Sequence, residues 1–388
     1  TGGEAKHFIS EGSIKVNEQS GIKVDNRYLK ASWATKQPWR GLFVLIVTVI
    51  MSFIITSSFN IETYTNFFGY LIMSCIPMFV VLGALWKGNS LPVDHIPQPL
   101  SGVLLFSFAF CWGALVCFGL INFLGGGALH PYVALHTIMT IITVFFLFLA
   151  FNFWPFNKLS LPASGFIFII AAYTIAFCLI QLFNFNLVSY PAGINPSPVD
   201  PVPLYGAGGP LEIFTAPAGP FIWEHAITYA ITSVSFLWCF TILGMWPFNK
   251  FKLSQPVFGI VVTITCLVLG AITFNIAIHQ LKIEPLTFMS YAIALIFGAL
   301  LTLNIVQTWP GRTLENPLTG GFVNLIFSLI AGIVAYIGIR AFCVWHFGET
   351  MVYPDSLNAI NTMMLGLLFP MWAAYGDLFE FWPLPPLD

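Results

Sequence analysis

Long apolar runs, separated by short polar or proline-containing segments, make up most of the chain after residue 40. Several of these runs reach about 20 residues, the length at which an α-helix crosses the hydrocarbon core of a bilayer. The runs are apolar on all faces, whereas the strands of a membrane β-barrel alternate between apolar and polar positions. The pattern therefore predicts ten transmembrane helices, at about residues 41–58, 66–86, 100–124, 133–154, 163–186, 225–246, 257–278, 286–308, 319–345 and 359–381.

Two short motifs recur at the ends of these spans. Pro-x-x-Gly opens each odd-numbered span, and a Trp closes each even-numbered span, in four cases with Pro directly after it. Proline suits the first turn of a helix, and glycine one turn later lets two helices approach closely. Tryptophan favours the membrane interface, and a following proline ends the helix. The openings are Pro38, Pro99, Pro162, Pro256 and Pro317, and the closings are Trp86, Trp154, Trp246, Trp309 and Trp382.

This regular order predicts an internal repeat. We expect an all-α polytopic membrane protein whose ten helices form five tandem helical hairpins in the same orientation, a pseudo-fivefold arrangement. The hairpins would each start and end on the Trp side and turn on the opposite side. They cover a transmembrane domain at 38–384, with repeats at about 38–87, 99–156, 162–248, 256–310 and 317–384.

Two segments lie outside the repeat pattern. Residues 1–37 form a polar, charged tail with weak periodicity, which we expect on the cytoplasmic side. Residues 188–223 form a long loop, rich in Pro and Gly, in the third outer turn. Loops of this length in compact proteins are usually lids, binding loops or disordered segments. The loop has few charges, so we expect an ordered flap, acting as a cover over helix ends or as a gate or docking surface.

Charge supports the membrane assignment and sets the orientation. Only 8% of the residues are charged and 57% are hydrophobic, whereas a soluble domain has about 25% charged residues. The net charge of −2 gives no sign of a nucleic-acid partner. Twelve of the fourteen Lys and Arg lie on the Trp side, which the positive-inside rule places in the cytoplasm together with both termini. We expect a bacterial or archaeal inner or plasma membrane, with the lipid bilayer as partner and other membrane subunits or self-association as additional partners.

The number of spans and the order of the repeats resemble those of the tellurite-resistance/dicarboxylate and plant slow-anion-channel family. The resemblance covers about residues 38–384 and carries no residue motif of that family. It implies that one helix of each hairpin lines a central pore. From the residues alone, five parallel hairpins would form either a ring with an axial channel or a solid bundle, and the 40 Phe and 12 Trp are enough to fill the axis.

Candidate functional residues gather at the outer ends of the spans. Histidines with carboxylates there would bind a metal or cofactor of unknown identity, or form an ion or substrate mouth. The alternative is helix capping and interface solvation, because most of these residues stand where the helix dipole favours their charge. Asp377 and Glu380, at the cytoplasmic end of the last span, are candidates for a gate. The outer residues are Glu62, His130, His136, Glu224, His225, His279, Glu284 and His346.

Three functions fit this pattern. The first is a channel or facilitator for a small anion or neutral solute. The second is a non-catalytic structural or docking subunit of a larger membrane complex, and the third is a metalloprotein with an outer His/Glu site. The membrane interior has almost no ionisable residues, which disfavours an ion-coupled pump. The chain lacks HExxH and desaturase-type histidine motifs, so an enzyme is the less favoured reading.

Overall fold

The computed structural model describes residues 34–87, 91–186, 205, 211–351 and 355–385. In this part of the chain, ten helical spans are long and apolar enough to cross a membrane, which confirms the prediction of a polytopic α-helical membrane protein. The predicted tail at 1–37 lies almost entirely outside the described residues. Of the long loop at 188–223, only residue 205 and residues 211–223 are described.

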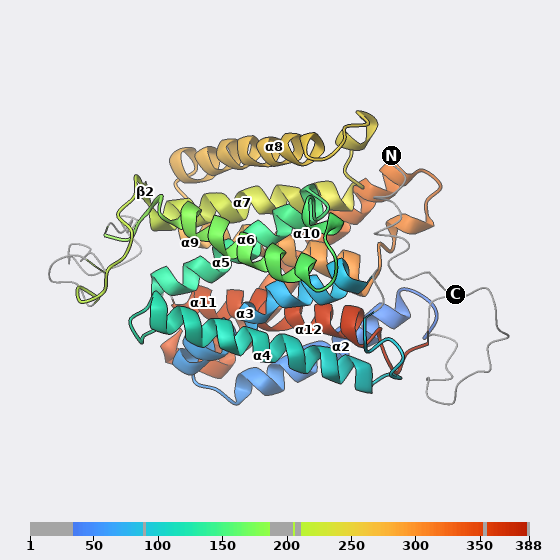
Figure 1. The fold of residues 1–388 in the computed structure, drawn as a ribbon, viewed down its shortest axis with the longest axis horizontal. Coiled ribbons are helices and arrows are strands. Elements are labelled where there is room, and N and C mark those ends of the chain that lie inside the picture. Colours follow the sequence, from blue (N-terminus) through green and yellow to red (C-terminus); the bar gives the residue numbers. More distant parts are fainter. Residues whose placement is uncertain (1–33, 88–90, 187–204, 206–210, 352–354, 386–388) are drawn as a thin grey trace.

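The spans run along the longest axis of the molecule (Figure 1). The odd-numbered spans are α2 (Trp39–Ser57), α4 (Leu100–Phe123), α6 (Ala163–Ile180), α8 (Val257–Phe274) and α10 (Pro317–Phe347). The even-numbered spans are α3 (Gly69–Val80), α5 (Pro131–Phe145), α7 (Trp223–Ile242), α9 (Pro285–Leu300) and a last span made of α11 (Asp355–Asn361) and α12 (Phe369–Ala373). Strands β1 (Phe183–Asn184) and β2 (Phe221–Ile222) pair in parallel at the outer end.

Several spans contain π-helical turns, in which the backbone bonds reach one residue further than in an α-helix. All the even-numbered spans except α7 have at least one, and so does α8. These turns continue the neighbouring α-helices, so each span remains one rod. They are Thr63–Phe68, Val81–Trp86, Phe146–Ala150, Asn275–Gln280, Leu301–Ile305, Thr362–Leu368 and Ala374–Leu378.

Burial alternates along the chain between exposed and buried helices. In the most apolar stretch of each even-numbered span, 61–72% of residues are buried, against 17–39% in the odd-numbered spans. The even-numbered spans are therefore inner helices and the odd-numbered spans are outer, lipid-facing helices. By contrast, an outer end, turn or loop is one on the side opposite the closing Trp residues. The inner helices form a closed ring: α3 packs on α5, α5 on α7, α7 on α9, α9 on the last span, and the last span on α3.

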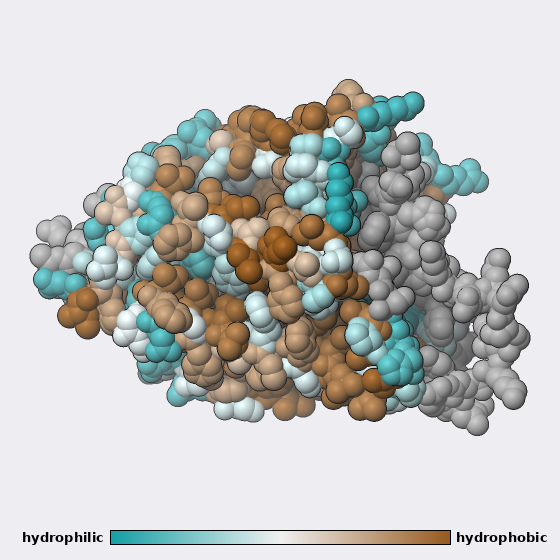
Figure 2. All heavy atoms as spheres, in the orientation of Figure 1, coloured by the Kyte–Doolittle hydropathy of each residue, from teal (hydrophilic) through white to brown (hydrophobic). Residues whose placement is uncertain are grey.

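The outer helices present large apolar side chains away from this ring. Examples are Ile54 on α2, Leu115 on α4 and Val334 on α10, all more than half exposed. Figure 2 shows hydrophobic residues across the middle of the visible face and most hydrophilic ones towards its two ends. A soluble protein avoids such a contiguous apolar surface. The outer surface therefore fits the lipid bilayer, and the protein is an integral membrane protein.

Helix packing differs from the expected hairpins. Among helices that follow one another in the chain, the pairs with extensive contact are α3 with α4, α5 with α6, α7 with α8, and α9 with α10. Each pair is joined on the Trp side, as Figure 1 shows for α7 and α8. The helices of an expected hairpin, such as α8 and α9, are joined by an outer turn and pack little on each other. The physical reason is that the connection after each of these closing Trp residues folds the next outer helix back onto the inner helix that precedes it.

The inner helices end earlier than predicted. Four of the five closing Trp residues are preceded by two residues with positive φ, a conformation that an α-helix cannot include. The spans therefore stop four residues before the Trp, at Ala150, Ile242, Ile305 and Leu378. The left-handed pairs are Asn152 (48°) and Phe153 (58°), Gly244 (62°) and Met245 (60°), Gln307 (51°) and Thr308 (63°), and Glu380 (51°) and Phe381 (61°).

The Pro-x-x-Gly motif marks a close helix–helix approach, as its glycine predicts. A methyl group added at the glycine would lie 2.5 Å from an aromatic ring on a distant inner span in three cases. A side chain of any size would therefore separate the two helices. The contacts are Gly102 with Phe379, Gly165 with Trp86, and Gly259 with Phe151.

In three outer helices, a glutamine directly before the motif proline links the start of the helix to the end of an inner span. In each case Oε1 accepts a hydrogen bond from the N–H of the motif glycine, and Nε2 donates to a backbone carbonyl of an inner span. The Oε1 distances are 3.0 Å for Gln37, 3.3 Å for Gln98 and 3.2 Å for Gln255. The acceptor carbonyls belong to Ile305 (3.1 Å), Leu378 (2.9 Å) and Ala150 (2.8 Å).

We expect the Gln255→Ala substitution to lower the free energy of unfolding by about 1–3 kcal/mol, because two hydrogen bonds at a partly buried site are lost. Reversible unfolding of the purified protein in mixed micelles measures this. Gln280→Ala is the matched control, because Gln280 is exposed at the far end of the same α8 span. Equal destabilisation by both substitutions would contradict a fastening role for Gln255.

Candidate functional site

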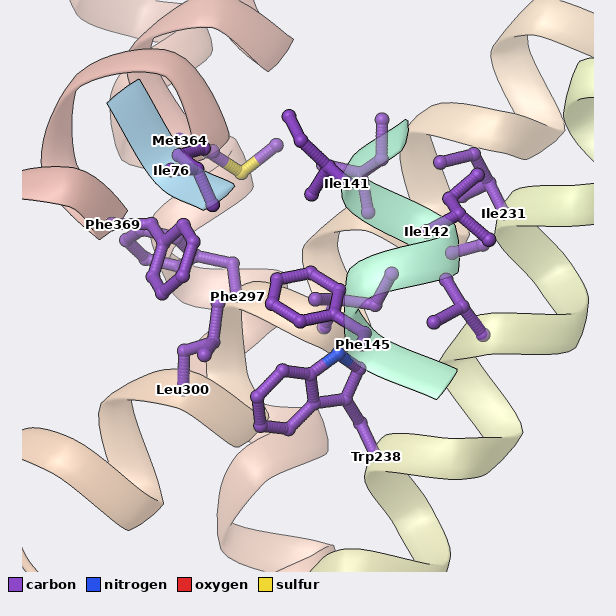
Figure 3. Close-up of a cluster of buried hydrophobic side chains, with 14 of the residues drawn as sticks. Ile76, Ile141, Ile142, Phe145, Ile231, Trp238, Phe297, Leu300, Met364 and Phe369 are labelled. Atoms are coloured by element: carbon purple, nitrogen blue, oxygen red, sulfur yellow. The ribbon is translucent and has the colours of Figure 1, made fainter. Parts of the chain in front are cut away.

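The axis of the inner ring is filled by large apolar side chains. Figure 3 shows residues from all five inner spans converging there. Phe145 lies at the centre of this cluster, with its ring centroid 5.1 Å from that of Trp238 and 6.0 Å from that of Phe369, both edge-on. Phe297 packs on Trp372 at 4.6 Å. Ile76, Ile141, Ile142, Ile231, Leu300 and Met364 complete the filling. The axis is closed in this structure.

Polar groups lie at the seams between inner helices. The Thr137 hydroxyl donates to the Tyr70 hydroxyl at 3.1 Å and links α5 to α3. Thr228 donates to the carbonyl of Pro285 at 3.0 Å and links α7 to α9, while Asn361 donates to Ser290 at 3.0 Å and links the last span to α9. Interhelical hydrogen bonds of this kind stabilise membrane helix packing. They join neighbouring helices of the ring.

Glu224 and Glu284 stand at helix N-termini, as the capping interpretation predicts. Glu284 is 4% exposed and accepts hydrogen bonds from the backbone N–H groups of Leu286 (2.9 Å) and Thr287 (2.6 Å) at the start of α9. Glu224 is buried in the first turn of α7. Negative charge is favourable at these ends because the helix dipole is positive there.

Some of the outer candidates come together and others do not. The rings of His225 and His279 lie 6.4 Å apart, next to Phe274 of α8. His346 lies elsewhere, with Nε2 at 3.2 Å from the carbonyl oxygen of Phe59, and Glu62 is exposed. In the described part of the chain, no group of three or more His, Cys, Asp and Glu is placed to hold a metal ion.

His130 is part of an anchor for the outer loop, which the sequence did not reveal. Its Nδ1 lies 2.6 Å from the hydroxyl of Tyr205, and that hydroxyl also accepts from the backbone N–H of Tyr132 at 2.9 Å. The ring of Phe214 packs on His130 at 4.8 Å. Tyr205 is 6% exposed. The loop therefore contacts the outer end of α5 at this point.

This contact is expected to weaken in acid. Desolvation by burial lowers the pKa of His130 below its ordinary 6.5. If the loop detaches from α5, the His130 imidazole regains its ordinary pKa and takes up a proton below pH 6.5. The contact is therefore stable above pH 6.5 and is lost as the pH falls towards the lowered pKa. Hydrogen exchange at 211–223, compared at pH 8 and pH 5 after correction for intrinsic rates, measures this. His130→Gln does not titrate, so a pH effect that persists in this variant would contradict the role of His130.

Asp377 and Glu380 lie at a cavity of about 290 Å³ on the predicted cytoplasmic side. Lys87 Nζ lies 4.0 Å from the Glu380 carboxylate, in a largely exposed ion pair of the kind that contributes little to stability. Described residues that line the cavity come from the ends of α3 and the last span, from α4, and from 91–98. The cavity therefore lies at the edge of the ring rather than on its axis.

The remaining candidate, His136, lies on the buried side of α5, against Tyr173 and Phe177 of α6. The ring neighbours of His136 are on α6, whereas His225 and His279 both contact Phe274 of α8. The outer candidates therefore do not make one site. Trp112 and Tyr173, which line the same cavity as His136, are functional candidates that sequence reasoning missed. Aromatic residues inside apolar spans are too common to single out.

The fold and these sites define a polytopic α-helical membrane protein with a closed inner ring. The chain matches no protein-family model, and no curated protein or solved structure is significantly similar to it. The resemblance to the tellurite-resistance/dicarboxylate and plant slow-anion-channel family therefore rests on the sequence pattern alone.

Proposed function

We propose that this protein is a channel or facilitator for a small anion or neutral solute, with the axis of the five inner helices as its pathway. The observation that carries this proposal is the closed ring of α3, α5, α7, α9 and the last span, screened from lipid by the outer helices. Such a ring provides one continuous axis from face to face. In the closed state described here, Phe145, Trp238 and Phe369 block it.

The proposal includes five structurally equivalent repeats. The start of each outer helix meets the end of one inner span. The pairs are α2 with α9, α4 with α12, α6 with α3, α8 with α5, and α10 with α7. Each outer helix therefore contacts the inner helix that belongs to the repeat two positions earlier. α2 and α4 have no such repeat before them, and they contact the inner helices of the fourth and fifth repeats, as in a closed ring. A regular cyclic offset of this kind supports the pseudo-fivefold arrangement.

Chemistry at the axis favours a neutral solute or a weakly hydrated anion. The side chains that fill the axis are aliphatic or aromatic, and an apolar constriction blocks hydrated ions by excluding water. We propose that Asp377 and Glu380 lie beside the cytoplasmic approach, and that the His225–His279 pair with Glu284 lies at the opposite mouth. Both termini are on the cytoplasmic side in this proposal.

Flux into liposomes tests the pathway. We expect Phe145→Ala to increase the flux of a small neutral solute or of nitrate on the order of tenfold, which corresponds to a barrier lowered by about 1.4 kcal/mol. Phe118→Ala is the matched control, because Phe118 is 52% exposed on the lipid-facing side of α4. Flux that stays at the protein-free level in the wild type and in Phe145→Ala would exclude the axis as a pathway.

A second candidate is a non-catalytic structural or docking subunit of a membrane complex. The filled axis favours this candidate, because a bundle that stays sealed offers no pathway to a solute. It predicts co-purification with fixed partners after mild solubilisation, and liposomes that remain impermeable in every axis variant. The loop anchored by Tyr205 would then be a docking surface on the outer side.

A further inference from the structure

A groove opens towards the lipid between outer helices α4 and α6, with α5 as its floor. Its volume is about 480 Å³, within the usual range for small-molecule sites. The walls are almost entirely apolar, with Val116, Leu120, Ile170 and Phe177 among the lining residues. This α4–α6 groove is separate from the axis, because the inner helix α5 lies between them.

Three buried polar atoms at this groove have no hydrogen-bond partner among the described residues. They are Nε1 of Trp112, Nδ1 of His136 and the hydroxyl of Tyr173, one from each of the three helices. All three residues line the groove, and His136 is only 2% exposed. A polar group left unpaired in hydrocarbon is costly, because neither water nor a lipid tail can satisfy it.

The three polar atoms lie deep in the membrane. At a rise of 1.5 Å per residue, His136 is roughly 8 Å from the outer end of its helix, Tyr173 roughly 10 Å and Trp112 roughly 16 Å. The ester carbonyls of a phospholipid lie at the interface, above this depth. A ligand that satisfies these atoms must therefore carry hydrogen-bonding oxygens down into the hydrocarbon region.

The side chains also define the shape and polarity of the ligand. The indole N–H of Trp112 and the hydroxyl of Tyr173 are donors, so they require acceptor oxygens, and Nδ1 of His136 accepts or donates according to its tautomer. The imidazole of His136 is stacked at 5.9 Å and 24° on Tyr173 and lies edge-on at 6.2 Å from Phe177. Aromatic rings in such a layer favour another flat ring.

We propose that the α4–α6 groove binds the head group of a membrane quinone, a flat ring with two carbonyl oxygens on an apolar tail. The carbonyl oxygens accept from Trp112 and Tyr173, and the tail leaves between α4 and α6 into the lipid. Binding alone is proposed, with no transfer of electrons. The proposal is independent of transport through the axis.

Binding of a decyl-substituted benzoquinone to the protein in lipid nanodiscs tests this site, with saturable quenching of tryptophan fluorescence as the readout. We expect Tyr173→Phe to weaken binding about tenfold through loss of one hydrogen bond. Gly119→Leu is expected to abolish binding, because a side chain there extends from the groove wall and its Cβ meets nothing within 4 Å. The fold is therefore expected to persist.

Two matched controls separate the groove from general effects. Gly338→Leu places the same side chain on α10, where the Cβ also meets nothing within 4 Å, and Tyr291→Phe removes a hydroxyl from a residue that is 48% exposed. Both are expected to keep wild-type affinity. Quenching that does not saturate, or is equal in Gly119→Leu and wild type, would overturn the proposal. So would native mass spectrometry showing a phospholipid, instead of a quinone, lost specifically from Gly119→Leu.

Discussion

Trp372→Ala is expected to lower the free energy of unfolding by about 3–5 kcal/mol, the usual cost of removing a large buried aromatic side chain. Trp372 is fully buried in α12, where its ring packs on Phe297 at 4.6 Å. Its indole N–H donates to the Thr48 hydroxyl at 2.9 Å and so connects the inner ring to α2. The substitution therefore opens a cavity between two inner helices and also removes a bond to an outer one.

Steric trapping or reversible unfolding in mixed micelles measures this change. Trp372→Phe keeps most of the ring and loses the hydrogen bond, so it is expected to cost only about 1–2 kcal/mol. Trp345→Ala is the matched control, because Trp345 is 77% exposed on α10. A loss at Trp345 as large as that at Trp372 would show that the inner ring is no better packed than the lipid-facing surface.

Gly298→Ala is expected to destabilise the protein by about 3 kcal/mol, at the upper end of the usual cost of overpacking. A Cβ at Gly298 in α9 would lie 1.9 Å from the carbonyl oxygen of Ser328 in α10, and a Cβ at Gly332 would lie 2.2 Å from that of Ala294. The two backbones are therefore in direct contact. Separating them would also break the 2.6 Å hydrogen bond between Thr302 and Ser328.

Gly338→Ala should have the opposite sign. Gly338 lies in α10 with nothing within 4 Å of its Cβ position, so alanine gains helix propensity of up to about 1 kcal/mol without a clash. The comparison uses the same chemical change in two packed helices, measured in the same unfolding assay. If both variants were stabilised, α9 and α10 would not be in backbone contact.

The sequence predicts the spans well because the bilayer imposes their length and the motifs mark their ends. It does not predict partners. Gly165 indicates a close approach to some helix, but nothing local identifies Trp86, which lies 78 residues away from the Ser164 that it bonds. The inner helices also end early, since residues such as Phe153 and Met245 give no sign of a left-handed backbone. The Gln that precedes the motif Pro in three of the five openings was a signal in the sequence for a polar contact at the start of those helices.

Site residues were harder to interpret than spans, because the same residue types serve several purposes. Glu284 was placed correctly at a helix N-terminus, and the structure shows that both its oxygens are used there. His130 and His136 share one helix, yet one contacts the outer loop and the other faces a lipid-side groove. Only the packing of the neighbouring helices distinguishes these environments.

The cyclic offset between outer and inner helices has a consequence for biosynthesis. α6, α8 and α10 meet inner spans that have already left the ribosome, so each can dock as soon as it is inserted. α2 and α4 depend on carbonyls of Ile305 and Leu378, which are translated some 270 to 280 residues after Gln37 and Gln98. These contacts at the starts of the first two outer helices therefore form only after the later spans have been synthesised, and the ring closes only with the last span.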